Sequence, residues 1–131
     1  MLKSEEDLEA MLVKLDRRFD RLEGGTFLVA VGANLAPVAL RIAVPVLVAQ
    51  VQIGGAPKGN PALESKVFRK LLQLNATDLL HAAYALEGDS IVLTAALELE
   101  SLDLNELEAV LADMAMALSK HVPVLRELTT K

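Results

Sequence analysis

The chain has no cysteine, no tryptophan and few aromatic residues of any kind. It is 131 residues long, and aromatic residues make up 3% of it. The absence of cysteine excludes disulfides, thiol chemistry and cysteine-ligated metal. It also fits a reducing compartment, and we expect a cytoplasmic location. Because hydrophobic residues reach 53% with so few aromatics, the core must be built from Leu, Val, Ile and Ala.

Clustered positive charge is lacking as well. The formal net charge is −5, whereas nucleic-acid binding needs clustered Lys and Arg for phosphates and aromatic side chains for base stacking. We therefore expect no nucleic-acid partner. The length is sufficient for one domain with a real core and too short for two. We expect a single domain over residues 1–131.

One long stretch is almost without charge. Between Thr26 and Pro57 the only charged residue is Arg41. No window of roughly 18 purely apolar residues exists in it, and the acidic N-terminus is unlike a signal peptide. The interrupting residues are Gly32, Asn34, Pro37, Arg41, Pro45, Gln50 and Gln52. We expect no membrane insertion, and we interpret the stretch as strands whose apolar surface needs cover from a dimer partner or another protein.

The first half of the chain predicts one helix followed by three strands. Residues 2–22 carry apolar side chains at helical spacing. These are Leu8, Met11, Leu12, Leu15, Phe19 and Leu22. Gly24 and Gly25 are expected to end this helix. Pro45 is expected to mark a sheet edge or a bend. The three strands are expected over residues 26–32, 38–44 and 46–53.

A second helix is expected after the glycine-rich loop at residues 54–59. Asn60 and Pro61 provide an N-cap and a first-turn proline. The helix is expected to reach about Leu74, with Asn75 as a left-handed terminator.

A hairpin and a third helix complete the predicted order. Residues 80–86 and 90–99 flank a short turn that contains Gly88. The last helix is expected to start at Asp103, and Pro123 is expected either to end it or to kink it. The order is then α-β-β-β-α-β-β-α. Because short loops favour antiparallel pairing, we expect an α+β fold in which helices pack on an antiparallel sheet.

No cluster of residues predicts a reaction. The two histidines, His81 and His121, lack the further ligands that a metal site needs. No serine lies in a Gly-x-Ser-x-Gly motif, and the loop at residues 54–59 lacks the Gly-Lys-Ser/Thr ending of a P-loop. The helix carboxylates, Asp113 among them, are interpreted as solvated. We expect no enzyme activity, no catalytic residue, no metal and no cofactor.

The order of elements and three short segments resemble a known family, the class I type III secretion chaperones. Residues 71–76, Leu-Leu-Gln-Leu-Asn-Ala, are similar to the segment that ends the second helix in that superfamily and in its YbjN-like relatives. The hairpin at residues 84–93 and the Leu-Glu-Leu-Glu run at residues 97–100 also fit. In layout the resemblance covers nearly the whole chain.

The resemblance implies a small acidic homodimer without a catalytic site. In that family the second helix and the adjacent hairpin strand build the dimer interface. Here that interface would contain Phe68, Leu71, Leu72, Leu74 and Tyr84. The first helix and the sheet would hold an extended apolar segment of a client protein. The client-binding residues would include Val46, Val48, Gln50 and Phe27.

Two other functions stay open. The chain would be a dimeric regulatory or scaffold protein without a client if it follows the YbjN-like relatives. It would be a small-ligand binder or an enzyme if a cavity between sheet and helices held a polar cluster. The polar candidates for such a cluster are His81, Tyr84, Arg41 and Thr94.

Overall fold

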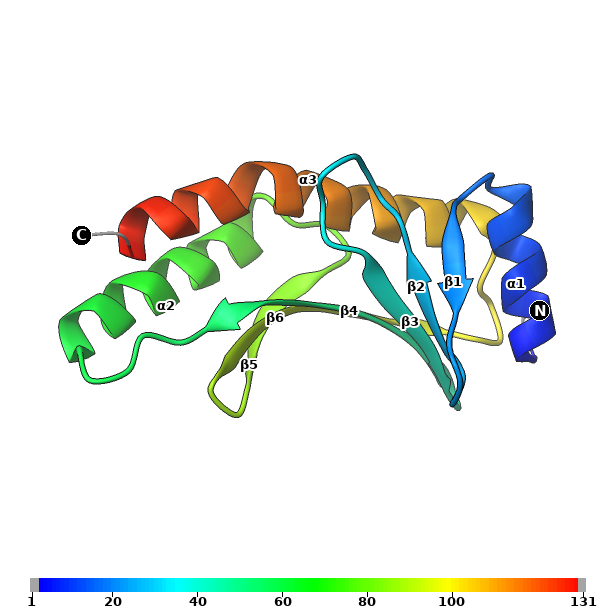
Figure 1. The fold of residues 1–131 in the computed structure, drawn as a ribbon, viewed down its shortest axis with the longest axis horizontal. Helices are drawn as coiled ribbons and strands as arrows, with labels where there is room; N and C mark the ends of the chain where they lie inside the picture. The colour runs from blue at the N-terminus through cyan, green and yellow to red at the C-terminus, as the bar shows by residue number, and fades with distance from the viewer. Residues whose placement is uncertain (1–2, 130–131) are drawn as a thin grey trace.

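A computed structural model describes residues 3–129 as three helices and a six-stranded antiparallel sheet (Figure 1). The strand order is β1-β2-β3-β4-β6-β5. This confirms the predicted α+β fold and adds one strand to the predicted five. The helices are α1 (Glu5–Lys14), α2 (Pro61–Thr77) and α3 (Leu104–Thr129). The strands are β1 (Phe19–Arg21), β2 (Thr26–Val29), β3 (Val38–Ala43), β4 (Val46–Gly55), β5 (Ala83–Glu87) and β6 (Ser90–Glu98).

The core lies between one face of the sheet and the helices. Figure 1 shows α2 and α3 over one face of the curved sheet, with α1 at the β1 end. Leu40, Ala49 and Ala95 stand opposite one another on β3, β4 and β6 and are buried. The same core receives the buried residues Leu107, Val110, Leu111, Met114, Ala117 and Leu118 of α3. Within residues 3–129, no helix covers the opposite face of the sheet.

The first helix is shorter than its apolar spacing predicts. It ends at Lys14, and Asp16 takes the left-handed conformation with φ 56°. The amides of Asp16 and Arg17 donate to carbonyls of the last helical turn, which is the Schellman pattern that ends helices. The prediction of one helix over residues 2–22 is therefore wrong in its second half. Its first residue lies outside the described residues.

The sixth strand, β1, forms from the end of that predicted helix. It pairs antiparallel with β2, and the ring of Phe19 lies 6.0 Å from the ring of Phe27. Phe19 thus packs against the core from a strand rather than from a helix. Leu22, predicted on the same apolar face, is exposed. Gly24 and Gly25, at φ 84° and 87°, form the β1–β2 turn instead of ending a helix, because the turn needs positive φ.

Two turns predicted from the sequence are present. Ala43 pairs with Val46, so Pro45 lies in the short turn between β3 and β4 and marks a bend. In the β5–β6 turn Gly88 has φ 60°. A glycine with positive φ at the first turn position is typical of a type II′ hairpin, so the predicted hairpin is confirmed.

The second helix begins as predicted and continues further. The side chain of Asn60 accepts a hydrogen bond from the amide of Leu63 at 3.1 Å, as an N-cap does. The helix then reaches Thr77. The prediction that Asn75 terminates it is therefore wrong, and Asn75 lies within the last helical turns.

The third helix also begins as predicted. The carboxylate of Asp103 accepts a hydrogen bond from the amide of Glu106 at 2.8 Å. The helix runs through Pro123 to Thr129, so the proline does not end it. Pro123 is exposed, while Leu125 beyond it returns to the core. Burial of the following turn holds the helix together across the missing hydrogen bond.

Candidate functional site

An apolar groove lies between α2 and the edge strand β5. Its volume is about 280 Å³, and it is lined by Phe68, Leu71, Leu72, Asn75, Tyr84, Ala85 and Leu86. The side chain of Leu72 is 69% exposed and that of Leu86 is 50% exposed. Large apolar side chains gathered along a groove mark interaction surfaces more often than single exposed ones do.

The groove brings together most of the residues expected at a dimer interface. Phe68, Leu71, Leu72 and Tyr84 all line it. Leu71 and Tyr84 are buried and form its floor, whereas Leu72 stands on its rim. Leu74 does not line the groove and is buried in the core of its own chain.

The backbone edge of β5 is closed at Tyr84 by a side chain of α2. The amide of Tyr84 donates to Asn75 Oδ1 at 2.7 Å, and Asn75 Nδ2 donates to the Tyr84 carbonyl at 3.2 Å. Residues alternate along an antiparallel edge, so the amide and carbonyl of Leu86 point outward like those of Tyr84. Asn75 thus protects one position of the edge. Sequence reasoning missed this role because it depends on a strand nine residues away.

A buried polar chain lies behind the groove and fixes Tyr84. The hydroxyl of Tyr84 lies 2.8 Å from His121 Nδ1, and His121 Nε2 lies 2.9 Å from Asp78 Oδ2. The hydrogen bond with His121 is the largest cause that lowers the pKa of Asp78, so its ionised carboxylate accepts from Nε2–H. With the ring proton on Nε2, Nδ1 accepts a hydrogen bond from the Tyr84 hydroxyl. All three groups are satisfied in this arrangement.

The electrostatics of this chain keep Tyr84 neutral. Burial raises the pKa of its phenol well above the ordinary value of 10, and the nearby carboxylates of Asp78 and Asp113 raise it further. His121 is only 3% exposed. Because α3 continues to Thr129, His121 lies inside the helix and faces the core.

Asp113 anchors the connection between α2 and β5. Its carboxylate accepts hydrogen bonds from the amides of Leu80, His81 and Ala82, with shortest distances of 3.2, 2.8 and 2.9 Å. It is 8% exposed, so its interpretation as a solvated carboxylate is wrong. Three converging amides compensate for burial of the charge. The sequence contained one sign that Asp113 is buried: it lies three residues after Val110, on the same face of the helix as that core residue.

The open face of the sheet carries a second set of predicted residues. Val46, Val48 and Gln50 lie on this face of β4 and are half-buried. Gln50 Nε2 lies 3.5 Å from the carboxylate of Glu87. Phe27 is not with them, because it points into the core and is fully buried. The structure therefore places three of the residues predicted to bind a client on one face and the fourth, Phe27, in the core.

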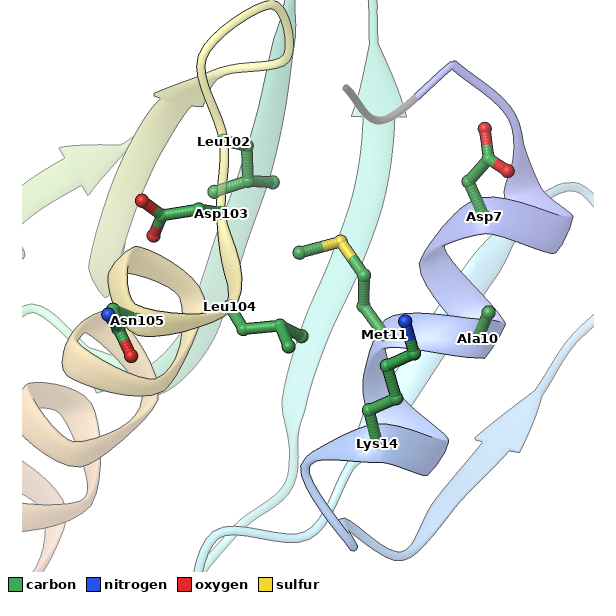
Figure 2. A pocket seen from close by; sticks show the side chains of 8 residues that line it. All are labelled: Asp7, Ala10, Met11, Lys14, Leu102, Asp103, Leu104 and Asn105. Atoms are coloured by element: carbon green, nitrogen blue, oxygen red, sulfur yellow. The ribbon is translucent and has the colours of Figure 1, made fainter.

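A larger cleft separates α1 from the start of α3. Its volume is about 580 Å³, and Figure 2 shows the side chain of Met11 pointing across it toward the segment at residues 102–105. Leu102 and Leu104 complete its apolar part. Its remaining lining residues are Asp7, Ala10, Lys14, Asp103 and Asn105. No local pattern in the sequence indicates this cleft, because it depends on how α1 and the start of α3 pack together.

The four polar residues that the sequence offered for a small-ligand site do not come together in the structure. Arg41 and Thr94 lie on the open face of the sheet, whereas Tyr84 lies on the helix-covered face. His81 is exposed on the connection before β5. Over residues 3–129, no group of three His, Cys, Asp or Glu side chains is placed to hold a metal ion. No helix in that range is long and apolar enough to cross a membrane.

Comparisons with known proteins agree on the architecture. The CesT_Tir_1 family model matches residues 1–131. One chain of the heterodimeric ExoU–SpcU complex from the type III secretion system of Pseudomonas aeruginosa is 20% identical, with a TM-score of 0.71 over 92% of this chain and 98% of that chain. YbjN from E. coli is 11% identical, with a TM-score of 0.66 over 90% of each chain. No curated protein sequence matches this chain. At these identities the two structures show a shared fold.

Proposed function

Because this chain belongs to the CesT_Tir_1 family of type III secretion chaperones, we propose that it is a non-catalytic homodimer that holds an extended apolar segment of a client protein. It would act in the cytoplasm as a single domain. The observation that carries the proposal is the apolar groove between α2 and β5, with Leu72 and Leu86 exposed along it.

The groove suits a second copy of the same chain. Covering a leucine side chain fully contributes on the order of 1.5–3 kcal/mol. In a dimer with two-fold symmetry the same patch meets itself, so each such contact occurs twice. The outward-pointing backbone of Leu86 adds hydrogen-bonding groups that a partner could use. Phe68, Leu71, Leu72 and Tyr84 would then lie at or next to the interface. Leu74 would support it from within the core.

The client segment would use the cleft beside α1 and the open face of the sheet. The apolar part of the cleft is lined by Met11, Leu102 and Leu104, and the carboxylates of Asp7 and Asp103 lie beside it. This combination favours a segment with apolar side chains next to basic ones.

Val46, Val48 and Gln50 would extend the contact along β4. Phe27 takes no direct part in this proposal because its side chain is buried.

The proposed dimer is tested by comparing the mass in solution of the parent chain with that of one surface variant. Size-exclusion chromatography with light scattering should give a mass of about twice 14.1 kDa for the parent chain. Leu72→Glu places a charge on the groove rim and should give the monomer mass. Leu80→Glu is the matched control, because Leu80 is 86% exposed and lies outside the groove. A dimer that persists in Leu72→Glu would refute the interface.

Client holding is tested separately by co-expression with the products of adjacent genes. One of them should co-purify with the parent chain, and Met11→Glu should abolish this by placing charge in the cleft. Val13→Glu is the control, since Val13 lies on α1 away from the cleft. If no product co-purifies while the dimer persists, the YbjN-like alternative of a dimeric protein without a client is favoured.

A further inference from the structure

Two adjoining hollows flank Arg126 in the C-terminal half of α3. One, of about 200 Å³, lies between α3 and the end of β4. The other, of about 320 Å³, lies between α3 and the β2–β3 connection, which Figure 1 shows passing beside the helix. Both hollows are lined by Ile53, Val122 and Arg126. They are distinct from the dimer groove and from the client cleft.

Most residues that line the two hollows are apolar, and the larger hollow has more polar lining than the smaller one. Val67, Ile91 and Leu125 line the smaller one, and Leu35 and Leu118 line the larger one. The polar lining residues are Asn34, Gln52, Ser119 and Thr129. Among residues 3–129, Arg126 is the single charged residue in either lining, and no carboxylate of these residues is present. This differs from the cleft beside α1, which contains Asp7 and Asp103.

The guanidinium of Arg126 is unpaired within the described part of the chain. None of the ion pairs among residues 3–129 involves it. Arg21, by contrast, is held by Glu5 and Glu6, and Arg17 is held by Glu108. An arginine stays charged at all ordinary pH values and presents a planar fork that fits a carboxylate. One cation beside apolar walls matches a ligand with one negative charge and an apolar body.

We propose that the two hollows form a binding site for a small amphipathic carboxylate of the fatty-acid class. The alkyl chain lies against Ile53 and Val122, and the carboxylate pairs with Arg126. Ser119 is the neighbouring hydrogen-bonding side chain, since the side-chain amide of Gln52 donates to Ser90 Oγ instead. A single cation favours a carboxylate over a doubly charged phosphate monoester. The site stands independently of the proposed dimer and client.

Titration of the full chain with octanoate, decanoate and decanol, followed by calorimetry, tests this site. Decanoate should bind saturably and about tenfold more tightly than octanoate, because each buried methylene adds to the apolar term. Decanol has the same alkyl chain without the charge and should bind at least tenfold more weakly than decanoate. Equal affinity for decanoate and decanol, or no saturable binding of decanoate, would overturn the proposal.

A charge-removing variant and a map of the contacts locate the site. Arg126→Gln should weaken decanoate binding about tenfold and leave decanol binding within about twofold. Arg69→Gln is the matched control, because Arg69 is exposed on α2 outside both hollows. Amide NMR shifts on decanoate addition should cluster at Gly54, Gly55 and Ser119. Unchanged binding in Arg126→Gln, or shifts centred on Leu72 and Leu86, would refute the assignment.

Discussion

Tyr84 serves two purposes with one side chain. Its ring forms part of the groove floor, and its hydroxyl begins the buried chain through His121 to Asp78. A phenol suits this position because one end is apolar and the other carries a hydrogen-bonding group. The polar chain fixes the ring, so it helps to keep the groove in shape.

The phenol of Tyr84 makes stability depend on alkaline pH. The pKa of this phenol is higher in the folded chain than its ordinary value of 10. The stability that the neutral phenol contributes to the fold is therefore complete below pH 10 and is lost as the pH rises above that value. We expect the parent chain to lose stability between pH 9 and pH 11 by more than Tyr84→Phe does. Urea unfolding of both proteins across this range measures the difference.

The same variant gives a check at neutral pH. Tyr84→Phe leaves His121 Nδ1 buried without its hydrogen-bond partner, which should cost about 1–3 kcal/mol in the free energy of unfolding. Equal stability of the two proteins at pH 7, together with parallel alkaline profiles, would contradict the role assigned to the hydroxyl.

At the scale of elements, the connection between α2 and β5 is held by side chains rather than by its own backbone. Asp113 of α3 receives the amides of Leu80, His81 and Ala82, and Asn75 of α2 pairs with the backbone of Tyr84. These contacts fix where the edge strand leaves the helix. The distance between the two walls of the groove follows from them.

Asp113→Asn should loosen this connection. An asparagine offers one oxygen acceptor where the carboxylate offers two, and it adds donors that face the same amides. We expect a loss of about 2–3 kcal/mol in the free energy of unfolding. Hydrogen exchange should show faster exchange at Leu80, His81 and Ala82.

Glu100→Gln provides the control for this substitution, since Glu100 is exposed on the β6–α3 connection. It should leave the free energy of unfolding within about 0.5 kcal/mol of that of the parent chain. The exchange rates at Leu80, His81 and Ala82 should not change. If Asp113→Asn behaves like this control, the carboxylate does not anchor the connection.

Local sequence patterns predicted caps and turns correctly where all the residues involved are close together in the sequence. The cap at Asn60, the cap at Asp103 and the turn at Gly88 depend on neighbours within a few residues, and all three are present. The helical spacing after residue 15 led to a wrong prediction. Phe19 falls at a helical spacing, but in the structure it lies on a strand and packs against Phe27. The spacing of apolar residues indicates which side chains are buried, but it does not show whether a helix or a strand carries them.

At the scale of the molecule, the arrangement of helices leaves specific surfaces uncovered. Figure 1 shows α2 and α3 on one face of the sheet only. The opposite face of the sheet, the α2–β5 groove and the cleft beside α1 are therefore left uncovered by the helices. This distribution agrees with a binding protein, and the family membership supports a non-enzymatic role.

The proposed dimer makes thermal stability depend on concentration. If folding and association are coupled, each tenfold dilution should lower the Tm by about 2–4 °C. Calorimetry at three concentrations measures this shift. Leu72→Glu should show a lower Tm that is independent of concentration, and a parent Tm that does not move on dilution would argue against a coupled dimer.

The sequence by itself determined the class of fold, the order of most elements, the N-caps at Asn60 and Asp103, and the turn at Gly88. Each of these depends on composition or on neighbours along the chain. Only the tertiary structure decided that residues 19–21 form a strand and that Asp113 and His121 are buried. It also decided which side chains meet at the groove and around Arg126. Those outcomes depend on contacts between residues far apart in sequence, which a local pattern does not contain.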